Sequence, residues 1–186
     1  MDNEEALLIE GCKDGNHQAQ KMLYERYAPA MMSVCQRYTG NKDTARDLLH
    51  DGFVRLYTKI HTYSGAGSFG GWMRKVFVTT ALEYLRRNDA LKNSVDIDNA
   101  DVLGIESADV SAVEQLSADE LFVCIMRLPD GYRTVFNLYA VEGYSYAEIA
   151  KELHLRESSI RSQYARARQM LQRILLSKFE YDYIAK

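Results

Sequence analysis

The chain has 186 residues, of which 47% are hydrophobic and 26% are charged, and this composition is that of a globular protein long enough for two small domains. The formal net charge of -3 excludes a protein that coats nucleic acid through a large positive excess. The acidic first residues and the lack of an apolar run of about 18 residues predict a cytoplasmic protein without membrane insertion.

Apolar residues recur at helical spacing in several segments, and no segment shows the alternation of a strand, so the sequence predicts an all-α fold. Asn16 is expected to cap a helix that runs to about Tyr38 and stops at Gly40. Asp43 opens the next helix, which ends before the glycine-rich segment Ser64–Gly67. The expected inward-facing residues of these two helices are Leu23, Tyr27, Met31, Val34, Tyr38, Ala45, Leu48, Leu49, Phe53, Leu56 and Ile60.

A further helix is expected from about Ser68 to Arg87, after which helical periodicity fades. It returns at Leu116 and breaks at Pro129. Helices are then expected over residues 130–141, 146–153 and 157–178.

The acidic residues concentrate in the middle of the chain. Residues 1–90 hold 12 basic and 11 acidic side chains, residues 91–118 hold 1 and 6, and residues 119–186 hold 10 and 9. Asn, Asp and Ser also accumulate where periodicity is lost. The sequence therefore predicts a helical domain over 1–90, a flexible acidic linker over 91–117 and a second helical domain over 118–186.

No arrangement typical of catalysis or of a cofactor site is present. Cys12, Cys35 and Cys124 lie far apart without metal-ligand spacing, and no glycine-rich phosphate loop occurs. The Asp, Glu and His residues form no convergent pair. We therefore expect reduced cysteines, no metal, no cofactor and no enzymatic activity.

The segment from Ser145 to Leu171 has the spacing of a helix-turn-helix motif. A short helix over Tyr146–Leu153 is followed by a turn over His154–Arg156 and then by a longer helix. The expected caps are Ser145 with Glu148, spaced as a capping box, for the first helix, and Glu157 or Ser158 for the second.

The longer helix has one apolar face, and its other faces are basic. Between residues 156 and 173 there are five arginines and one acid, and arginine makes forked contacts to phosphates and guanine edges. An isolated basic amphipathic helix is more often a solvated surface, but the preceding short helix and turn favour DNA binding. The expected buried stripe is Ile160, Tyr164, Ala167, Leu171 and Ile174. The expected DNA contacts are Ser158, Ser159, Arg161, Ser162, Ala165 and Arg166 near bases, and Arg168 and Arg173 on phosphates.

The helix from Trp72 to Arg87 combines an aromatic residue with basic residues and ends in an Arg-Arg pair. Aromatic rings stack on bases and cations hold phosphates, so this pattern suits contact with a single DNA strand. A Trp on an amphipathic helix is more often part of a core, and this alternative stays open.

Four segments occur in an informative order. They are DTARDLLHDGF at 43–53, Phe69 with WMRKVFVTTALEYLRR at 72–87, LPDGYRTVF at 128–136, and GYSYAEIA at 143–150 with Arg166-Ala167-Arg168. In this order, and on both sides of an acidic linker, they resemble the extracytoplasmic-function (group IV) family of RNA polymerase sigma factors. The resemblance spans nearly the whole chain.

The resemblance implies that the N-terminal domain binds core RNA polymerase and opens promoter DNA. Residues 43–60 would dock on the clamp of the β′ subunit through Asp47, His50, Asp51 and Phe53, although Phe53, like Leu48, is equally suited to the core. The loop Tyr63–Phe69 and the helix from Trp72 would melt the minus-ten element and accept a flipped base. The implied minus-ten contacts are Tyr63, Ser68, Phe69, Trp72, Arg74, Lys75, Thr79, Arg86 and Arg87.

The resemblance also implies that the helix-turn-helix reads the minus-thirty-five element and that the polymerase partner surfaces include the β flap. The acidic linker would thread toward the RNA exit path, and an anti-sigma factor is an expected partner. The sequence departs from the family pattern at His50, where Gln is usual, and at Gly52, which costs a helix about 1 kcal/mol. It also departs at Thr79 and Glu83, where Asn and Asp are common.

We therefore expect a sigma factor that binds core RNA polymerase and directs promoter recognition and DNA melting for transcription initiation. The main alternative is a stand-alone helix-turn-helix transcription regulator whose N-terminal helices form a dimerisation or ligand-binding domain. A second alternative is a helical protein-interaction module in which the arginines are solvated. A sigma factor gives promoter-dependent transcripts with core polymerase, which neither alternative does.

Overall fold

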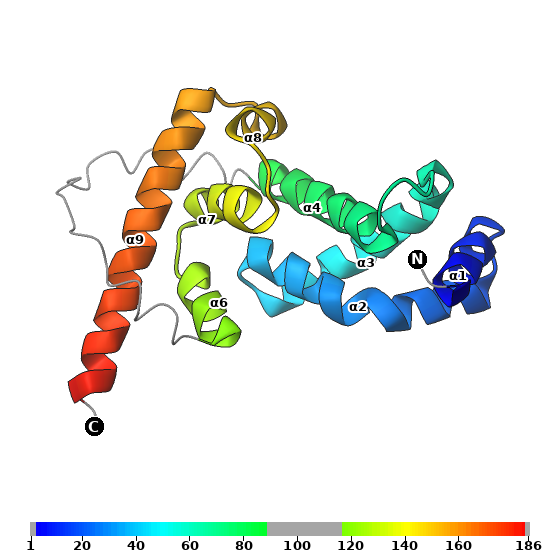
Figure 1. Ribbon diagram of the computed structural model, residues 1–186, viewed down its shortest axis with the longest axis horizontal. Coiled ribbons are helices and arrows are strands. Elements are labelled where there is room, and N and C mark those ends of the chain that lie inside the picture. Colours follow the sequence, from blue (N-terminus) through cyan, green and yellow to red (C-terminus); the bar gives the residue numbers. More distant parts are fainter. Residues whose placement is uncertain (1–2, 89–116, 185–186) are drawn as a thin grey trace. The chain divides into compact units, whose positions relative to one another are not determined.

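The computed structural model describes residues 3–88 and 117–184, and every regular element within these ranges is helical (Figure 1). The chain divides into two compact units, Met1–Arg87 and Asn88–Lys186. The predicted all-α class is therefore confirmed. Apart from Ser117, the predicted linker lies outside the described residues. None of the helices in the described ranges combines the length and the apolar character that crossing a bilayer needs.

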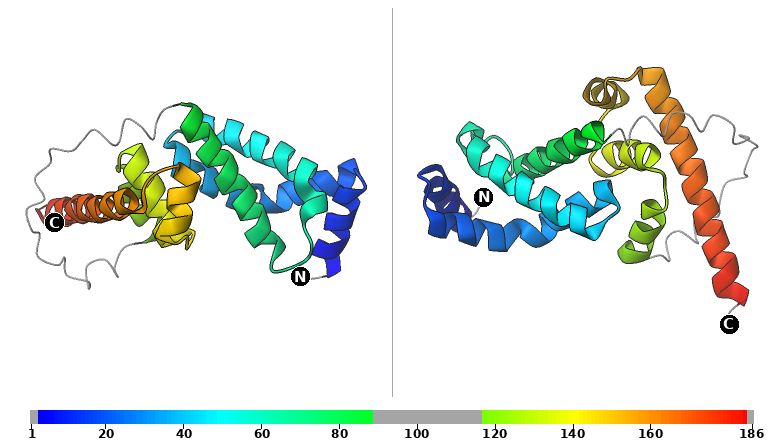
Figure 2. Two further views of the ribbon diagram at one scale, coloured as in Figure 1. Left: turned by 90° about the horizontal axis from the view of Figure 1, so that it is seen from above. Right: turned by 180° about the vertical axis from the view of Figure 1, so that it is seen from behind.

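The first unit contains a group of packed helices and one short 3-10 turn. The helices α2, α3 and α4 pack against one another, and α1 lies at one end, against the N-terminal part of α2 and near η1 (Figures 1 and 2). No bounds were predicted for α1, whereas the other helices lie close to their predicted positions. The elements are α1 (Asn3–Lys13), α2 (His17–Thr39), α3 (Lys42–Lys59), η1 (Ile60–Thr62) and α4 (Phe69–Arg87).

Polar side chains and a glycine set the ends of α2 and α3. The Asn16 side chain accepts hydrogen bonds from backbone N–H groups of the first turn of α2, the shorter at 2.9 Å, as predicted. α2 ends at Gly40, whose φ of 70° is the left-handed conformation that glycine adopts without strain. The side chain of Asn41 caps α3 by accepting from the N–H of Asp43 at 2.8 Å, so Asp43 lies inside the first turn and does not open the helix.

The predicted inward faces of α2 and α3 form much of the core of the first unit. All the predicted apolar residues are buried except Tyr27, which is half-buried. α4 contributes Phe77, which is fully buried. A Cβ atom at Gly52 would lie 2.3 Å from Cε1 of Phe77, so α3 and α4 approach closely at this point. Gly52 therefore makes room for an aromatic ring, which the sequence pattern had not indicated.

The second unit is arranged around its last helix. The helices α8, α7 and α6 lie beside α9 in that order from its N-terminal end (Figures 1 and 2). One core cluster joins Cys124 and Leu128 to Ala167 and Leu171 of α9. The elements are α6 (Ala118–Met126), α7 (Asp130–Phe136), η2 (Asn137–Val141), α8 (Tyr146–Leu153) and α9 (Glu157–Ile184).

A buried guanidinium joins α6 to α7. Arg133 is 4% exposed, and its Nη1 donates to the carbonyl groups of Leu128 at 3.0 Å and Met126 at 3.4 Å, at the end of α6. Its Nη2 donates to Oδ1 of Asp130 at 2.5 Å. The charge is therefore paired, and it satisfies carbonyl groups that a helix end leaves without intrahelical partners.

The predicted helix over residues 130–141 changes its winding. Regular α-helix ends at Phe136, and Asn137–Val141 forms a π-helical turn in which the carbonyl of Asn137 accepts from the N–H of Glu142 at 2.9 Å. In this turn the ring of Tyr139 stacks on Tyr146 of α8, with centroids 4.4 Å apart. Apolar periodicity does not report such a change in winding.

Candidate nucleic-acid interface

The predicted helix-turn-helix is present in the second unit. α8 spans Tyr146–Leu153 as predicted, and its capping box is formed: Ser145 Oγ accepts from the N–H of Glu148 at 3.2 Å, and the Glu148 carboxylate accepts from the N–H of Ser145 at 2.8 Å. His154 ends α8 in the left-handed conformation, with a φ of 54°. The chain then turns into α9 within two residues.

The N-terminal half of α9 presents the predicted DNA contacts at the surface. α9 begins at Glu157, so Arg156 takes the cap position, and the predicted caps Glu157 and Ser158 lie inside the first turn. Of the predicted stripe, Ile160, Ala167 and Leu171 are buried, whereas Tyr164 and Ile174 are half-buried. This burial turns the polar residues outward. The predicted contacts are all exposed or half-exposed: Ser158, Ser159, Arg161, Ser162, Ala165, Arg166, Arg168 and Arg173.

Arg161 has two neighbours with defined geometry. Its Nη2 donates to Oε1 of Glu157 at 2.6 Å, and its Cζ lies 4.6 Å from the centre of the Tyr146 ring. Tyr146 was not among the predicted site residues. The sequence signal that could have identified Tyr146 is its position: it is an aromatic residue directly after the cap of α8, where the two helices of the motif meet.

In the first unit, an aromatic cluster fixes the loop between η1 and α4. The Tyr63 and Phe69 rings meet edge-on with centroids 5.2 Å apart, and Phe69 stacks on Trp72 at 5.7 Å. The Tyr63 hydroxyl also donates to the carbonyl of Gly67 at 2.9 Å. Tyr63 and Phe69 are buried, whereas Trp72 is half-buried. Among these three predicted minus-ten contacts, Trp72 is the most exposed, and the rings of Tyr63 and Phe69 pack beside it.

The remaining predicted minus-ten contacts lie along α4 and at its start. Ser68 is exposed, and its hydroxyl accepts from the N–H of Gly71 at 3.2 Å. Helical periodicity places Trp72, Lys75 and Thr79 on one face of α4 and Arg74 on another. The Arg-Arg pair follows at the C-terminal end, with Arg86 half-exposed and Arg87 exposed. The structure therefore brings together most of this set, but Arg74 lies apart.

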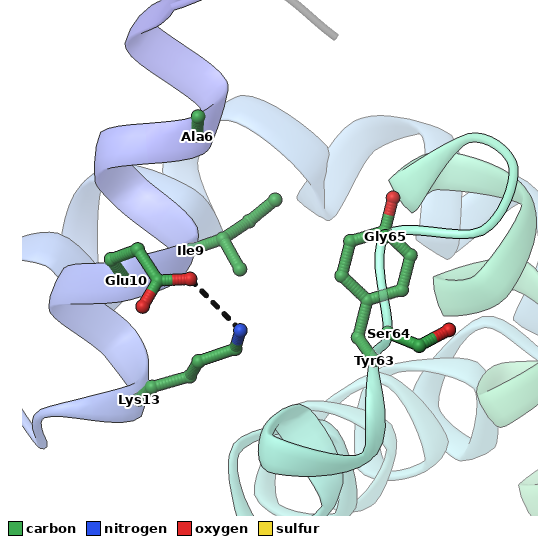
Figure 3. Close-up of a pocket in the computed structure, with 7 residues that line it drawn as sticks. All are labelled: Ala6, Ile9, Glu10, Lys13, Tyr63, Ser64 and Gly65. Carbon is green, nitrogen blue, oxygen red and sulfur yellow. Dashed lines mark hydrogen bonds and ion pairs between the residues drawn. The ribbon is translucent and has the colours of Figure 1, made fainter.

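A cavity of about 170 Å³ lies between α1 and the loop after η1. Its wall includes Ile9 and Tyr63, and Figure 3 shows Ile9 and Lys13 extending from α1 toward the loop. Lys13 Nζ lies 2.9 Å from Oε1 of Glu10, so an ion pair borders the cavity (Figure 3). The α1 residues were missed by the sequence analysis, since the contact between α1 and this loop is not local.

The predicted polymerase contacts divide between the two sides of α3. Asp47, His50 and Asp51 are exposed on one face, which the exposed Val54 continues. Phe53 is buried, and its ring contacts the rings of Tyr24, Tyr57 and Phe77. Phe53 therefore belongs to the core beneath the exposed face of α3, which is the alternative that the sequence had left open for it, and it is not an exposed contact.

A two-pronged ion pair ties α3 to α4 beside this face. Arg55 Nη1 and Nη2 donate to the two carboxylate oxygens of Glu83 at 2.7 and 2.6 Å. The hydrogen bonds from Arg55 hold the pKa of Glu83 below its ordinary value. The two carboxylate oxygens thus make the paired contact that suits the planar guanidinium of arginine.

The three cysteines are buried, as expected of small apolar residues. Cys12, Cys35 and Cys124 are buried and form no disulfide. Burial raises the pKa of the Cys12 thiol to about 11 and that of Cys35 to about 12. Within the described ranges, no group of three or more His, Cys, Asp or Glu side chains is placed to hold a metal ion.

Comparison with known proteins assigns the two units to one family. The family model described as Sigma-70 region 2 matches residues 23–91, and that described as Sigma-70, region 4 matches residues 118–171. The ECF RNA polymerase sigma-E factor of Haemophilus influenzae is 29% identical over 175 residues, which is 89% of this chain and 92% of that protein. The chain belongs to the extracytoplasmic-function family of sigma factors. The sigma-E factor of Escherichia coli K12 is 28% identical over 174 residues, covering 89% of this chain and 91% of that protein.

Two solved structures share the fold of this sigma factor. CnrH, solved in complex with the cytosolic domain of CnrY, has a TM-score of 0.50 and 18% identity over 94% of this chain and 99% of its own. The sigma factor RpoE of Bartonella quintana, solved with the anti-sigma factor NepR, has a TM-score of 0.50 and 20% identity over 83% and 95%.

The comparisons support a sigma factor and not the stand-alone regulator. The predicted family, the helix-turn-helix and a role in promoter-specific transcription are confirmed at this level. The individual residues that contact DNA and polymerase stay predictions.

Proposed function

We propose that the two units of this sigma factor divide promoter recognition between them. α9 reads the minus-thirty-five element, while α4 and the loop before it open the minus-ten element. The observation that carries this proposal is that the matches to sigma-70 regions 2 and 4 fall on the two units in order. The protein needs no catalytic residue for this role, because core polymerase performs the chemistry.

The charge of the chain agrees with such a division. A net charge of -3 gives little non-specific attraction to DNA, since that attraction comes from cations that replace counterions on phosphates. Core polymerase supplies that attraction, and the arginines of α9 supply a local choice of sequence. The place of action is then the cytoplasm, where polymerase and chromosome lie.

Recruitment is proposed to involve the exposed face of α3 with Asp47, His50 and Asp51. This face lies on the opposite side of α3 from the buried Phe53, and the Arg55–Glu83 pair fixes α3 against α4. We propose the β′ clamp as the surface that receives it, and the β flap as the contact of the second unit. An anti-sigma factor is a further proposed partner, because the similar RpoE was solved with NepR.

The cavity between α1 and the loop after η1 is proposed to accept the base that is flipped out of the minus-ten element. The apolar wall from Ile9 and Tyr63 suits the face of a base, and the Glu10–Lys13 pair offers donors and acceptors to its edge. The Lys13→Ala variant should then open the promoter more slowly, as followed by 2-aminopurine fluorescence in the minus-ten element. The Lys21→Ala variant, at an exposed lysine of α2, is the control and should open it at the wild-type rate.

Transcription in vitro tests the proposed function. Core polymerase is mixed with the protein and with sheared genomic DNA from the source cells, and transcript 5′ ends are mapped. The proposal predicts new start sites that share two upstream elements, and their loss when Arg161 and Arg166 are both replaced by alanine. A chain that binds DNA by itself but never changes the start sites of polymerase would overturn it.

A further inference from the structure

Arg161 is an exposed side chain whose position is nevertheless defined. Its side chain is 60% exposed, yet it contacts the Glu157 carboxylate at 2.6 Å and the face of Tyr146 at 4.6 Å. An exposed arginine without such neighbours samples many rotamers, and binding must then fix it at a cost in entropy. Arg161 has therefore been oriented before DNA arrives.

The Tyr146 ring beneath Arg161 packs against two further tyrosine rings. Tyr146 of α8 stacks on Tyr139 of the π-helical turn, with centroids 4.4 Å apart and the planes 8° from parallel. Tyr164 of α9 contacts Tyr139 at 4.5 Å and Tyr146 at 6.0 Å. Rings from three elements thus contact one another, and the guanidinium of Arg161 lies over the Tyr146 ring.

Glu157 gives the arginine its second contact and compensates its charge. It lies in the first turn of α9, where the helix dipole favours an acid. The contact uses one hydrogen of Nη2, and a guanidinium has five donors, so a fork remains for another acceptor pair. Because the carboxylate repels phosphates and neutralises Arg161, the pair favours a base edge over the DNA backbone.

We propose that Tyr146 and Glu157 are positioning residues that fix the guanidinium of Arg161 for one base pair and thereby set the sequence specificity of α9 there. This inference rests on the proposed function, since it takes Arg161 to face the minus-thirty-five element. Tyr146 and Glu157 would thus contribute to sequence specificity without touching DNA themselves.

Selection from a randomised library tests the inference. Holoenzyme is reconstituted with each variant and selects duplexes that are randomised over the minus-thirty-five region and carry a minus-ten element used by the wild type. Sequencing then gives the base preference at each position. The Arg161→Ala variant should lose the preference at one base pair. Tyr146→Leu and Glu157→Gln should weaken it at that same pair by roughly 2- to 5-fold, the range of an exposed cation–π contact or an exposed ion pair. Tyr146→Phe keeps the ring beneath the guanidinium and should retain most of the preference.

A second readout separates positioning from loss of structure. Glu157→Gln leaves one positive charge without compensation, so holoenzyme with this variant should bind non-specific duplex more tightly. The slope of log affinity against log salt should become steeper by up to about 0.9, as for one added phosphate contact. Damage to the fold would instead weaken specific and non-specific binding together.

The outcomes distinguish this inference from the proposed function. If Arg161→Ala loses the preference at one base pair while Tyr146→Leu and Glu157→Gln retain it in full, the positioning role is wrong and Arg161 remains a reader. A loss spread equally over all positions in Tyr146→Leu also overturns the positioning role. If Arg161→Ala keeps every preference of the wild type, the assignment of Arg161 as a reader fails, and the inference fails with it.

Discussion

Replacement of Gly52 by alanine tests how closely α3 and α4 must approach. α3 carries the face proposed to bind polymerase, and α4 carries the residues proposed to open DNA. A Cβ atom at position 52 would lie 2.3 Å from Cε1 and 2.5 Å from Cδ1 of Phe77, which is nearer than real Cβ contacts come. The added methyl group therefore requires either ring or helix to move.

The expected magnitude is a balance of two effects. In an exposed helix, Gly→Ala stabilises by about 0.5–1 kcal/mol, because alanine loses less backbone entropy. The Phe77 ring is fully buried and meets Phe53 edge-on with centroids 5.2 Å apart, so it has no free direction in which to turn. Overpacking of this kind costs about 1–3 kcal/mol. We expect Gly52→Ala to lower the free energy of unfolding by about 0.5–2 kcal/mol.

Urea unfolding followed by tryptophan fluorescence measures this change. Trp72 is the single tryptophan of the chain, so its fluorescence reports the first unit. The control is Gly70→Ala in α4, because no atom lies within 4 Å of a Cβ there and the change should be neutral or stabilising. The added substitution Phe77→Leu should lessen the effect of Gly52→Ala. Equal stability of Gly52→Ala and Gly70→Ala would refute the close approach of α3 and α4.

Three further predictions concern other contacts. Glu83→Gln should lower the free energy of unfolding by about 1 kcal/mol at pH 7. Because Arg55 holds the pKa of Glu83 below its ordinary value of 4.5, the ion pair stabilises the fold above that pH. The difference in stability between the variant and the wild type should vanish as acid protonates Glu83. A difference that stays constant in urea titrations from pH 7 to pH 3 would contradict this. Arg133→Ala should destabilise the second unit by about 3 kcal/mol, as measured by amide hydrogen exchange, because it removes a buried paired charge and a helix cap. Full rescue by Arg133→Lys would argue against the contacts that the two Nη atoms of Arg133 make with Asp130 and with the end of α6. Cys12 and Cys35 should resist a thiol reagent at pH 8 until urea unfolds the protein, and rapid labelling of the native chain would contradict their burial.

Local chemistry made most helix positions predictable. Asn16 and the Ser145–Glu148 box lie where side-chain oxygens meet the first N–H groups of a helix, and both are present as predicted. Gly52 shows the limit, because its role depends on Phe77 in another helix. The π-helical turn after Phe136 likewise has no signal in the apolar periodicity. Periodicity reports which face is buried, but not what lies against it.

The candidate site was predictable where residue type alone suffices. The arginines of α9 were expected at the surface, and the structure places them there. The roles of aromatic residues were harder to predict, because an aromatic ring can either fill a core or stack on a ligand. Tyr63 and Phe69, which were predicted as DNA contacts, are buried and pack beside Trp72. Tyr146 was missed for the opposite reason, because its contact with Arg161 joins two helices across the turn.

The division of promoter recognition between the two units is tested most directly by photocrosslinking in the initiation complex. A photoreactive amino acid replaces Ala165 of α9 or Lys75 of α4, both of which are exposed, in holoenzyme bound to a promoter whose start site is mapped. We expect Ala165 to crosslink to the minus-thirty-five element and Lys75 to the minus-ten element. Crosslinks from both positions to one element, or in the reverse order, would contradict the division.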